Sequence, residues 1–294
     1  MPLKDWGLAL LANTAWALNY IAGKEGADHF SPLMFTALRF TVVLLLLLPF
    51  LKPVPGQMMQ IFKIGLILGV GHFSMIFLGL SMAGGVGGVA IATQLYVPFA
   101  TLMAWLWLGE FMSVQRWLGT GLAIAGVVLV GFDPEVLQYW QALLLISLAG
   151  LFLAIATIWM KGLKGVGIWQ LQAWIACIAT PSLWLLSLIF ESDHLLRLQT
   201  AAWSDWLAPV YSALGATLTG HAIVYYLVQR YPVSLTTPLM MLSPIMAIFL
   251  GIWIYGEAPG WKLWVGALLT LGGIGVIHMR LRGRRPMPDK LIEP

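Results

Sequence analysis

Long apolar runs, interrupted by glycine, proline or charged residues, repeat along the whole chain. Within them polar residues do not alternate with apolar ones at every second position, as the strands of a membrane barrel would require. About 20 apolar residues of helix are enough to cross the hydrocarbon core of a bilayer, so each run predicts one membrane-spanning helix. The ten predicted spans cover residues 6–22, 33–50, 61–82, 86–107, 114–132, 140–160, 168–190, 206–228, 234–255 and 261–279.

The composition agrees with a chain that lies mostly inside a membrane. Of its 294 residues, 60% are hydrophobic and 10% are charged, whereas a soluble domain carries about 25% charged residues. The composition therefore excludes a sizeable soluble domain. The single cysteine, Cys177, lies in an apolar run, which excludes a disulfide framework and a cysteine-based metal cluster. We expect neither a metal nor a cofactor.

The distribution of positive charge predicts how the chain is oriented. An even number of spans places both termini on one side of the membrane, and most of the 16 lysine and arginine residues lie on that side. Cytoplasmic loops carry the excess of such residues, so both termini are predicted to be cytoplasmic. The basic tail is typical of a topology or membrane-surface signal and not of a nucleic-acid site. The opposite side carries only Lys24, Arg39, Arg197 and Lys262.

The two halves of the chain carry the same landmarks in the same order. The run that ends in Gly109 and Glu110 has a counterpart, 147 residues later, that ends in Gly256 and Glu257. A duplication of five helices explains this order. It predicts one repeat over 1–135, a second over 136–280 and a basic tail over 281–294. Other landmarks recur at nearly the same shift, namely Trp117 with Trp264, Gly119 with Gly266, Gly126 with Gly273, Pro98 with Pro244 and His72 with His221.

An odd number of helices in each repeat has a geometric consequence. The second repeat must enter the membrane from the side opposite to the first, so the two repeats are inverted. Inverted repeats are a recurring architecture of secondary transporters, which bind their substrate near the bilayer midplane where the repeats meet. The architecture therefore favours transport.

The same residues resemble a known group of proteins. Ten spans in two halves, each with Gly-Glu followed by Trp-x-Gly and a later glycine, resemble the drug/metabolite transporter superfamily. Within it, the chain is most similar to the EamA-type permeases and, among these, to the YddG-type exporters of aromatic and other neutral amino acids. The resemblance implies an all-α membrane protein with ten transmembrane helices in two inverted five-helix repeats around a central cavity, lined mainly by spans 1, 3, 4, 6, 8 and 9. It also implies amino-acid export across a bacterial inner membrane.

Polar and aromatic side chains inside the spans are the candidates for substrate binding, because polar groups in hydrocarbon usually face a cavity or a partner helix. In span 1, Asn13, Trp16 and Tyr20 are three and four residues apart and share one helix face. This face offers an amide and two aromatic rings to a substrate with an apolar or aromatic side chain. The alternative is that the same face packs against another helix.

His72 in span 3 and His221 in span 8 occupy related places in the two repeats. Imidazole can donate, accept and exchange a proton near neutral pH, which suits a zwitterionic substrate. The alternative is a structural hydrogen bond between helices. Tyr225 follows His221 by four residues, on the same helix face.

Spans 4, 6 and 9 supply the remaining candidates. Gln94 is the other deep amide, and Tyr96 lies about 200° further round the helix, so we expect Gln94 to face the cavity more squarely. Trp159, near the end of span 6, is a further candidate that an interfacial position would also explain. Proline removes a helical hydrogen bond and kinks the helix, so Pro98 and Pro244 are candidate hinges or static kinks.

The two Gly-Glu motifs lie on opposite faces of the membrane in this topology. Glu110 and Glu257 therefore cannot form one central site, and we expect each to cap the N-terminus of the helix that follows it. The motif, with Gly109 and Gly256, is thus a structural signature of the fold. Arg39 lies several residues inside span 2, where we expect its stem to snorkel towards the interface.

The charged residues also bear on the mechanism. All 12 aspartate and glutamate residues fall in predicted tails, loops or span ends, so proton coupling through a carboxylate at the centre of the membrane is not expected. We expect facilitated or weakly coupled export of amino acids by alternating access. Exchange, or proton coupling through His72 or His221, is the alternative mechanism.

Other classes of protein fit the sequence less well. A membrane-embedded enzyme would need a pattern such as His-Glu-x-x-His or paired intramembrane aspartates, and the sequence has neither, so we expect no catalytic residues. The alternative function is export of other small metabolites or drugs by a member of the same superfamily. The expected partners are a small-molecule substrate and the lipid bilayer, and the expected form is a monomer that binds no nucleic acid.

Overall fold

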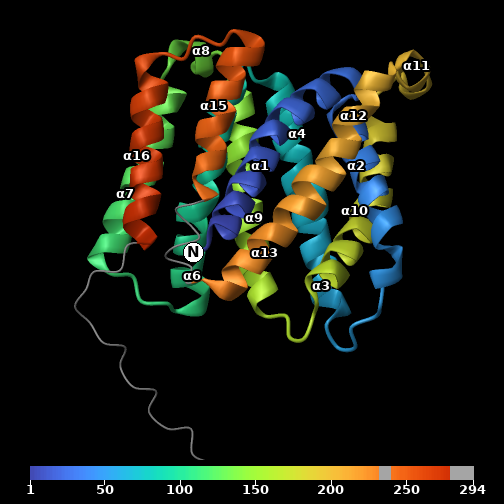
Figure 1. Ribbon diagram of the computed structural model, residues 1–294, viewed down its shortest axis with the longest axis horizontal. Helices are drawn as coiled ribbons and strands as arrows, with labels where there is room; N and C mark the ends of the chain where they lie inside the picture. The colour runs from blue at the N-terminus through green and yellow to red at the C-terminus, as the bar shows by residue number, and fades with distance from the viewer. Residues whose placement is uncertain (232–239, 279–294) are drawn as a thin grey trace, which may run out of the picture.

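The computed structural model describes residues 1–231 and 240–278, and all regular structure in these residues is helical (Figure 1). The chain first forms α1 (Leu3–Phe30), α2 (Pro32–Leu47), α3 (Met58–Ile64), α4 (Phe73–Met82), α5 (Val86–Ala92), α6 (Tyr96–Leu108), α7 (Val114–Gly131) and α8 (Pro134–Leu137). It then forms α9 (Trp140–Lys161), α10 (Ile168–Phe190), α11 (His194–Thr200), α12 (Trp203–Tyr211), α13 (His221–Arg230), α15 (Leu242–Tyr255) and α16 (Trp261–His278).

Short segments of different helical pitch join several of these helices. Two are 3₁₀ turns, η1 (Leu48–Phe50) and η3 (Thr93–Leu95). The other two are π-helical, η2 (Gly65–His72) between α3 and α4 and η4 (Ser212–Gly220) between α12 and α13. Spans 3, 4 and 8 are therefore helical throughout but change pitch within the membrane.

Eight helical stretches in the described residues are long and apolar enough to cross a membrane. They confirm eight of the ten predicted spans. The first predicted span lies inside α1, and the ninth is described only from residue 240 onward, where α15 begins at Leu242. The count of ten therefore stays a prediction. The eight stretches are Pro32–Phe50, Met58–Met82, Val86–Leu108, Val114–Gly131, Trp140–Lys161, Ile168–Phe190, Trp203–Val224 and Trp261–His278.

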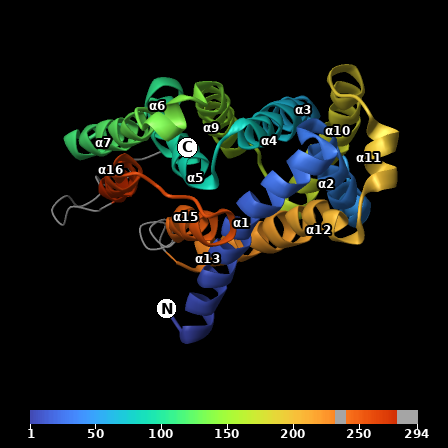
Figure 2. The same ribbon diagram turned by 90° about the horizontal axis from the view of Figure 1, so that it is seen from above.

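The helices stand in two rows when the molecule is seen from above (Figure 2). One row holds α7, α6, α9 and α4, and the other holds α16, α15, α1 and α12. The rows are joined at one end by the packing of α7 against α16, and at the other by the packing of α2 against α10. Each of these joining pairs consists of helices that hold the same place in the two predicted repeats.

The α7–α16 contact is reciprocal. A Cβ atom added to Gly126 would lie 2.5 Å from the carbonyl oxygen of Gly266, and one added to Gly119 would lie 2.6 Å from that of Gly273. Gly119 and Gly126 correspond to Gly266 and Gly273 at the 147-residue shift, so the two contacts are equivalent. Contacts of this kind are what a two-fold axis between two like surfaces produces. Glycine is required at these positions because the two backbones touch.

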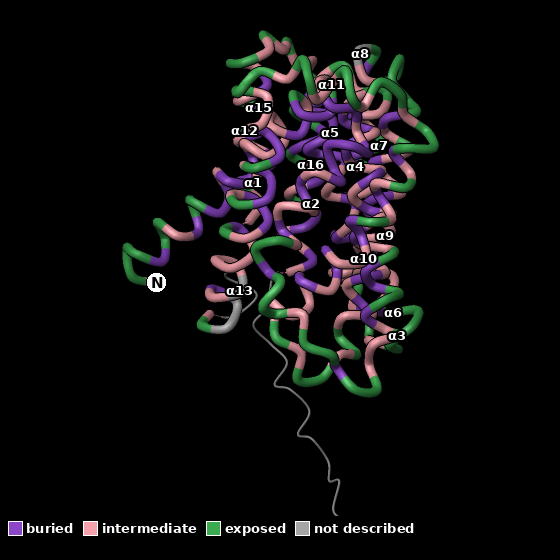
Figure 3. Tube along the Cα trace, turned by 90° about the vertical axis from the view of Figure 1, so that its right-hand side faces the viewer, coloured by how far each residue is buried: buried purple, intermediate pink, exposed green. Residues whose placement is uncertain are grey.

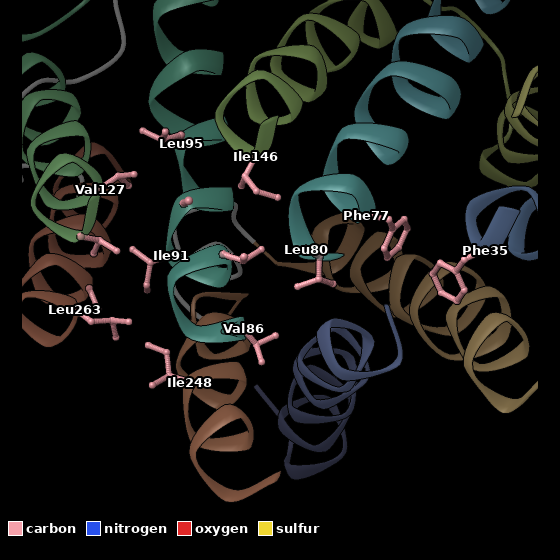
Figure 4. Close-up of a cluster of buried hydrophobic side chains, with 14 of the residues drawn as sticks. Phe35, Phe77, Leu80, Val86, Ile91, Leu95, Val127, Ile146, Ile248 and Leu263 are labelled. Atoms are coloured by element: carbon pink, nitrogen blue, oxygen red, sulfur yellow. The ribbon is translucent and has the colours of Figure 1, made fainter. Parts of the chain in front are cut away.

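The apolar core is concentrated towards one end of the molecule. Figure 4 shows its largest cluster, to which α2, α4, α5, α7, α9, α15 and α16 all contribute. In Figure 3 the buried stretches gather around α4, α5 and α16, towards the end that carries α8 and α11, whereas α6 and α13 at the other end are mostly half-buried or exposed. The two parts of span 4 differ in the same way, because every residue of α5 is buried.

Candidate functional site

The two π-helical segments place the paired histidines. His72 is the last residue of η2, and His221 is the first residue after η4. In η4, the Thr217 hydroxyl donates to the carbonyl of Ser212 at 2.9 Å, five residues earlier. π-helical turns are rare and often occur at functional sites, so their presence in both halves of the chain marks the surroundings of η2 and η4 as the candidate site.

The two histidines have different hydrogen-bond partners. The Nδ1 of His72 donates to the carbonyl of Ala149 in α9 at 2.8 Å. The Nδ1 of His221 donates to the carbonyl of Thr217 on its own helix at 2.9 Å, and its ring meets the edge of Trp16 with centroids 5.8 Å apart. His72 thus joins two helices, as the structural alternative proposes, whereas the hydrogen bond of the His221 Nδ1 stays within its own helix.

Asn13 holds the start of α15. Its Oδ1 accepts from the backbone N–H of Ser243 at 2.8 Å, and its Nδ2 donates to the carbonyl of Ala9 at 2.7 Å. The side chain is fully buried. An amide in this position satisfies a backbone donor at the first turn of a helix, where no helical acceptor exists.

Trp16 and Tyr20 also contact irregular helical segments. The indole Nε1 of Trp16 donates to the carbonyl of Ala216 in η4 at 3.2 Å. The hydroxyl of Tyr20 shares a hydrogen bond of 2.8 Å with that of Thr93 in η3. All three members of the stripe on α1 thus contact other helical segments, namely α15, η4 and η3. Their role in substrate binding stays a prediction.

Span 4 changes pitch beside Pro98. Proline has no N–H to donate to the carbonyl of Gln94, and the 3₁₀ turn η3 lies at this point. Gln94 is half-buried, and its amide has no hydrogen-bond partner within 1–231 and 240–278. Tyr96 instead borders a separate cavity of about 260 Å³ between α6, α7, α9 and α16. The two residues face different surroundings, as their angular separation predicts.

The remaining predicted residues lie elsewhere or are not fully described. Trp159 packs against the cluster formed by α2 and α10, and its carbonyl accepts from the Nε2 of Gln60 at 2.6 Å. Pro244 is buried in the first turn of α15. Tyr225 belongs to α13, but its side chain lies outside the described residues.

Arg39 lies in surroundings that the sequence analysis did not predict. Its side chain is 1% exposed, and the guanidinium carbon lies 4.1 Å from the ring centroid of Phe73. Its Nη2 and Nε donate to the Thr217 hydroxyl at 2.8 and 3.2 Å. The expected snorkelling is therefore wrong, because the stem turns inward onto aromatic rings and a hydroxyl. The signal was present, since an ionisable residue inside a span is a functional candidate by default.

Arg39 connects residues from both halves of the chain. It lies on α2, its hydroxyl partner lies in η4 of the second half, and its aromatic partner begins α4 of the first. The described geometry thus brings both histidines and the indole of α1 into one network at the level of the π-helical segments. In order, the contacts run through Trp16, His221, Thr217, Arg39, Phe73 and His72.

The Gly-Glu motifs end their helices in the same way. Gly109 and Gly256 have φ values of 64° and 66°, in the left-handed region that favours glycine. The N–H groups of Glu110 and Glu257 each donate to the carbonyl six residues earlier, at 3.2 and 3.3 Å. The glycine stops the helix, and the glutamate is the first residue to leave it.

Glu257 caps a helix, but not the one that follows it. Its two carboxylate oxygens accept from the backbone N–H groups of Val86 and Gly87, at 2.6 and 3.2 Å. These amides begin α5, in the other half of the chain. The predicted cap on α16 is therefore wrong, because both oxygens are already used by a helix that tertiary packing brings closer.

Glu110 has side-chain partners instead. It pairs with Lys161 at 3.0 Å and with Arg116 at 3.9 Å. The helix that follows, α7, is capped by Ser113, which accepts from the N–H of Arg116 at 3.3 Å. The predicted cap by Glu110 is wrong as well, because a hydroxyl residue directly before the helix takes that place.

The described helices are those of a multi-pass membrane protein. A model of the EamA-like transporter family matches the chain twice, over residues 6–132 and 140–279. The chain belongs to the EamA-like transporter family, which makes it a transporter and not an enzyme.

Individual proteins agree with this assignment. The chain is 27% identical, over 97% of its length and 98% of the relative's, to a probable amino-acid metabolite efflux pump of Salmonella typhimurium. It is 22% identical, over 87% of each chain, to the uncharacterized inner membrane transporter YedA of Escherichia coli. It also shares the fold of a solved crystal structure, with a TM-score of 0.64 and 18% identity over 93% of this chain and 96% of that one.

Proposed function

We propose that the protein exports amino acids, aromatic and other neutral ones, from the cytoplasm across a bacterial inner membrane by alternating access. The observation that carries the proposal is the network of His72, Arg39, Thr217 and His221. It combines a cation, hydroxyl and imidazole groups and aromatic rings at one level of the membrane, as a zwitterion with an apolar side chain would need. The name of the Salmonella relative supports the same substrate class.

The proposed architecture is ten spans in two inverted repeats, 1–135 and 136–280, with both termini in the cytoplasm. Three observations support it. The family model matches each half separately, the glycine contacts of α7 and α16 are reciprocal, and α2 packs against its repeat counterpart α10. The polar network joins residues of both proposed repeats, and transporters with inverted repeats bind substrate where the repeats meet.

The described conformation fits a state that is closed towards the outside. Every residue of α5 is buried, and the Glu257 carboxylate accepts hydrogen bonds from the backbone N–H groups of its first turn. The other part of span 4, α6, is mostly half-buried or exposed. In the proposed cycle, the change of pitch before Pro98 and the first turn of α15, which contains Pro244, act as hinges that let the two ends open in turn.

Transport in this proposal is facilitated or only weakly coupled. The acidic residues of the described part of the chain lie in loops or at helix ends, outside the network around Arg39. A proton-coupled carrier often uses an intramembrane carboxylate, so a gradient of the amino acid itself is the proposed driving force. The alternative, export of other metabolites or of drugs, becomes an outcome of the following test.

The test is a counterflow screen in proteoliposomes. Vesicles that contain the purified protein and one amino acid are diluted into the same radiolabelled amino acid, and protein-free vesicles serve as the control. Aromatic and other neutral amino acids are expected to exchange, and charged ones are not. If sugars or cationic drugs compete with the label while neutral amino acids do not, the proposed substrate class is wrong.

A second arm examines coupling. The counterflow rate is measured with and without an imposed pH gradient, for the wild type and for His72→Ala. We expect no increase in either protein. An increase in the wild type that His72→Ala loses would replace facilitated export by proton coupling through this histidine.

A further inference from the structure

Arg39 carries a positive charge inside a predicted span, and no carboxylate of residues 1–231 and 240–278 pairs with it. A guanidinium stays charged at any physiological pH, and enclosing such a charge is costly unless it is paired. The ion pairs within the described residues join Lys24 to Asp28, His29 to Asp205, and Glu110 to both Arg116 and Lys161. Arg39 belongs to none of them.

The guanidinium is also incompletely hydrogen-bonded. The Thr217 hydroxyl accepts hydrogen bonds from both the Nε and the Nη2 of Arg39. The face of the guanidinium lies on the ring of Phe73. Its Nη1 is buried and has no hydrogen-bond partner in the part of the chain that the structure describes. Buried donors are normally satisfied, so Nη1 is a donor that a bound acceptor would satisfy.

The groups around the Nη1 side of the guanidinium indicate which kind of acceptor would bind there. A planar guanidinium matches a carboxylate in shape as well as charge, and it binds one through two parallel hydrogen bonds. The rings of Phe40, Phe73 and Phe77 lie against it, and His72 and His221 are one contact further on. These surroundings favour an anion attached to an apolar or aromatic body over a phosphate, which would need several cations.

We propose that Arg39 binds the α-carboxylate of the transported amino acid, an inference that rests on the proposed function and names the group that holds the substrate. Without a substrate, Arg39 donates to Thr217, and this contact joins α2 to η4 across the two halves of the chain. When the transport cycle separates α2 from η4, the substrate carboxylate accepts hydrogen bonds from Nη1 and Nη2. The substrate then supplies the missing negative charge, and the aromatic rings contact its side chain.

The test compares ligands that differ only at the carboxyl group. Counterflow of radiolabelled L-phenylalanine is inhibited with unlabelled L-phenylalanine or with L-phenylalaninamide, which keeps the ring and the amino group. In the wild type the amide is expected to inhibit at least about tenfold more weakly, as the loss of a charge-assisted hydrogen bond predicts. An amide that inhibits as well as phenylalanine would overturn the inference and leave amino-acid transport intact.

Variants then assign the effect to this residue. Arg39→Gln is expected to raise the half-saturating phenylalanine concentration by at least about tenfold and to abolish the difference between the acid and the amide. Arg39→Lys, which keeps the charge but loses the fork, should retain part of that difference. The matched control is Arg230→Gln, because Arg230 also lies on a ring, that of Tyr226, but is exposed; it should behave as the wild type.

The outcomes separate the two proposals. If wild-type vesicles show no counterflow for any amino acid, the proposed function fails and the carboxylate assignment fails with it. If the wild type prefers the acid and Arg39→Gln keeps the same preference, another group binds the carboxylate. Melting temperatures in detergent identify a variant that has not folded, in which case the wild-type comparison of acid and amide decides alone.

Discussion

The two Gly-Glu motifs are identical in sequence and backbone, yet their carboxylates have different tasks. Both glycines have φ angles in the left-handed region, and both glutamate N–H groups donate to a carbonyl of the preceding helix. Glu257 then binds the backbone amides that begin α5, while Glu110 pairs with exposed side chains of Lys161 and Arg116. Each motif borders a cavity, of about 350 Å³ for Glu257 and about 260 Å³ for Glu110.

One position explains part of the difference. A Cβ atom added to Gly251 would lie 2.7 Å from the carboxyl carbon of Glu257. The residue that corresponds to Gly251 in the first half is Ala104, which is 8% exposed. A methyl group thus stands where the second half leaves room for a carboxylate. The equivalent of Val86 is Val233, which lies outside the described residues.

The comparison teaches that the motif itself specifies only how the helix ends. What the carboxylate binds depends on small residues elsewhere and on which helix end lies within reach. Three sets of variants test this conclusion, beginning with the contact where the two halves agree.

The largest losses are expected where the repeats are symmetric. Gly126→Ala and the repeat-related Gly273→Ala each place a methyl group about 2.5 Å from backbone atoms of the partner helix, and backbone cannot give way as a side chain can. Each should destabilise the protein by about 1–3 kcal/mol or more, and by similar amounts, as judged by thermal unfolding in detergent. Gly121→Ala, which meets nothing within 4 Å, is the control. Clearly unequal losses would contradict the reciprocal packing.

Gly251→Ala should convert the second motif into a copy of the first. The new methyl group displaces the Glu257 carboxylate and leaves the first amides of α5 without acceptors, for an expected loss of about 1–3 kcal/mol. Thermal unfolding measures the loss, and limited proteolysis near residues 83–86 reports whether α5 has loosened. Gly272→Ala, on an open helix surface, is the matched control. Unchanged stability and proteolysis would show that the carboxylate does not need this space.

The smallest losses of stability are expected when the two glutamates themselves are replaced. Glu257→Gln weakens a helix cap and should cost about 1 kcal/mol. Glu110→Gln removes an exposed ion pair, which is worth between about 0 and 1 kcal/mol, and should leave the substrate profile unchanged. Thermal unfolding at low and high salt distinguishes them, because only the exposed pair is strongly screened. A larger loss for Glu110→Gln than for Glu257→Gln would reverse the assignment of tasks.

Much of the candidate site could be predicted from residue type and spacing. The stripe of Asn13, Trp16 and Tyr20 shares a face because helical periodicity alone requires it. The paired histidines were found through the repeat. Arg39 was misjudged, because the partners that turn it inward lie 34 and 178 residues further along the chain. No local pattern reports such a distance.

The sequence by itself determined the eight confirmed spans and the left-handed glycines, because hydrophobic length and backbone sterics act locally. It also determined membership of a transporter family, since both halves carry the family's landmarks. Only the tertiary structure decided that Glu257 caps a helix of the other half, that Asn13 holds the start of α15, and that the Arg39 guanidinium lies enclosed between Phe73 and Thr217. These contacts join segments that are distant in the chain, and packing alone selects which of several possible partners comes within hydrogen-bonding distance.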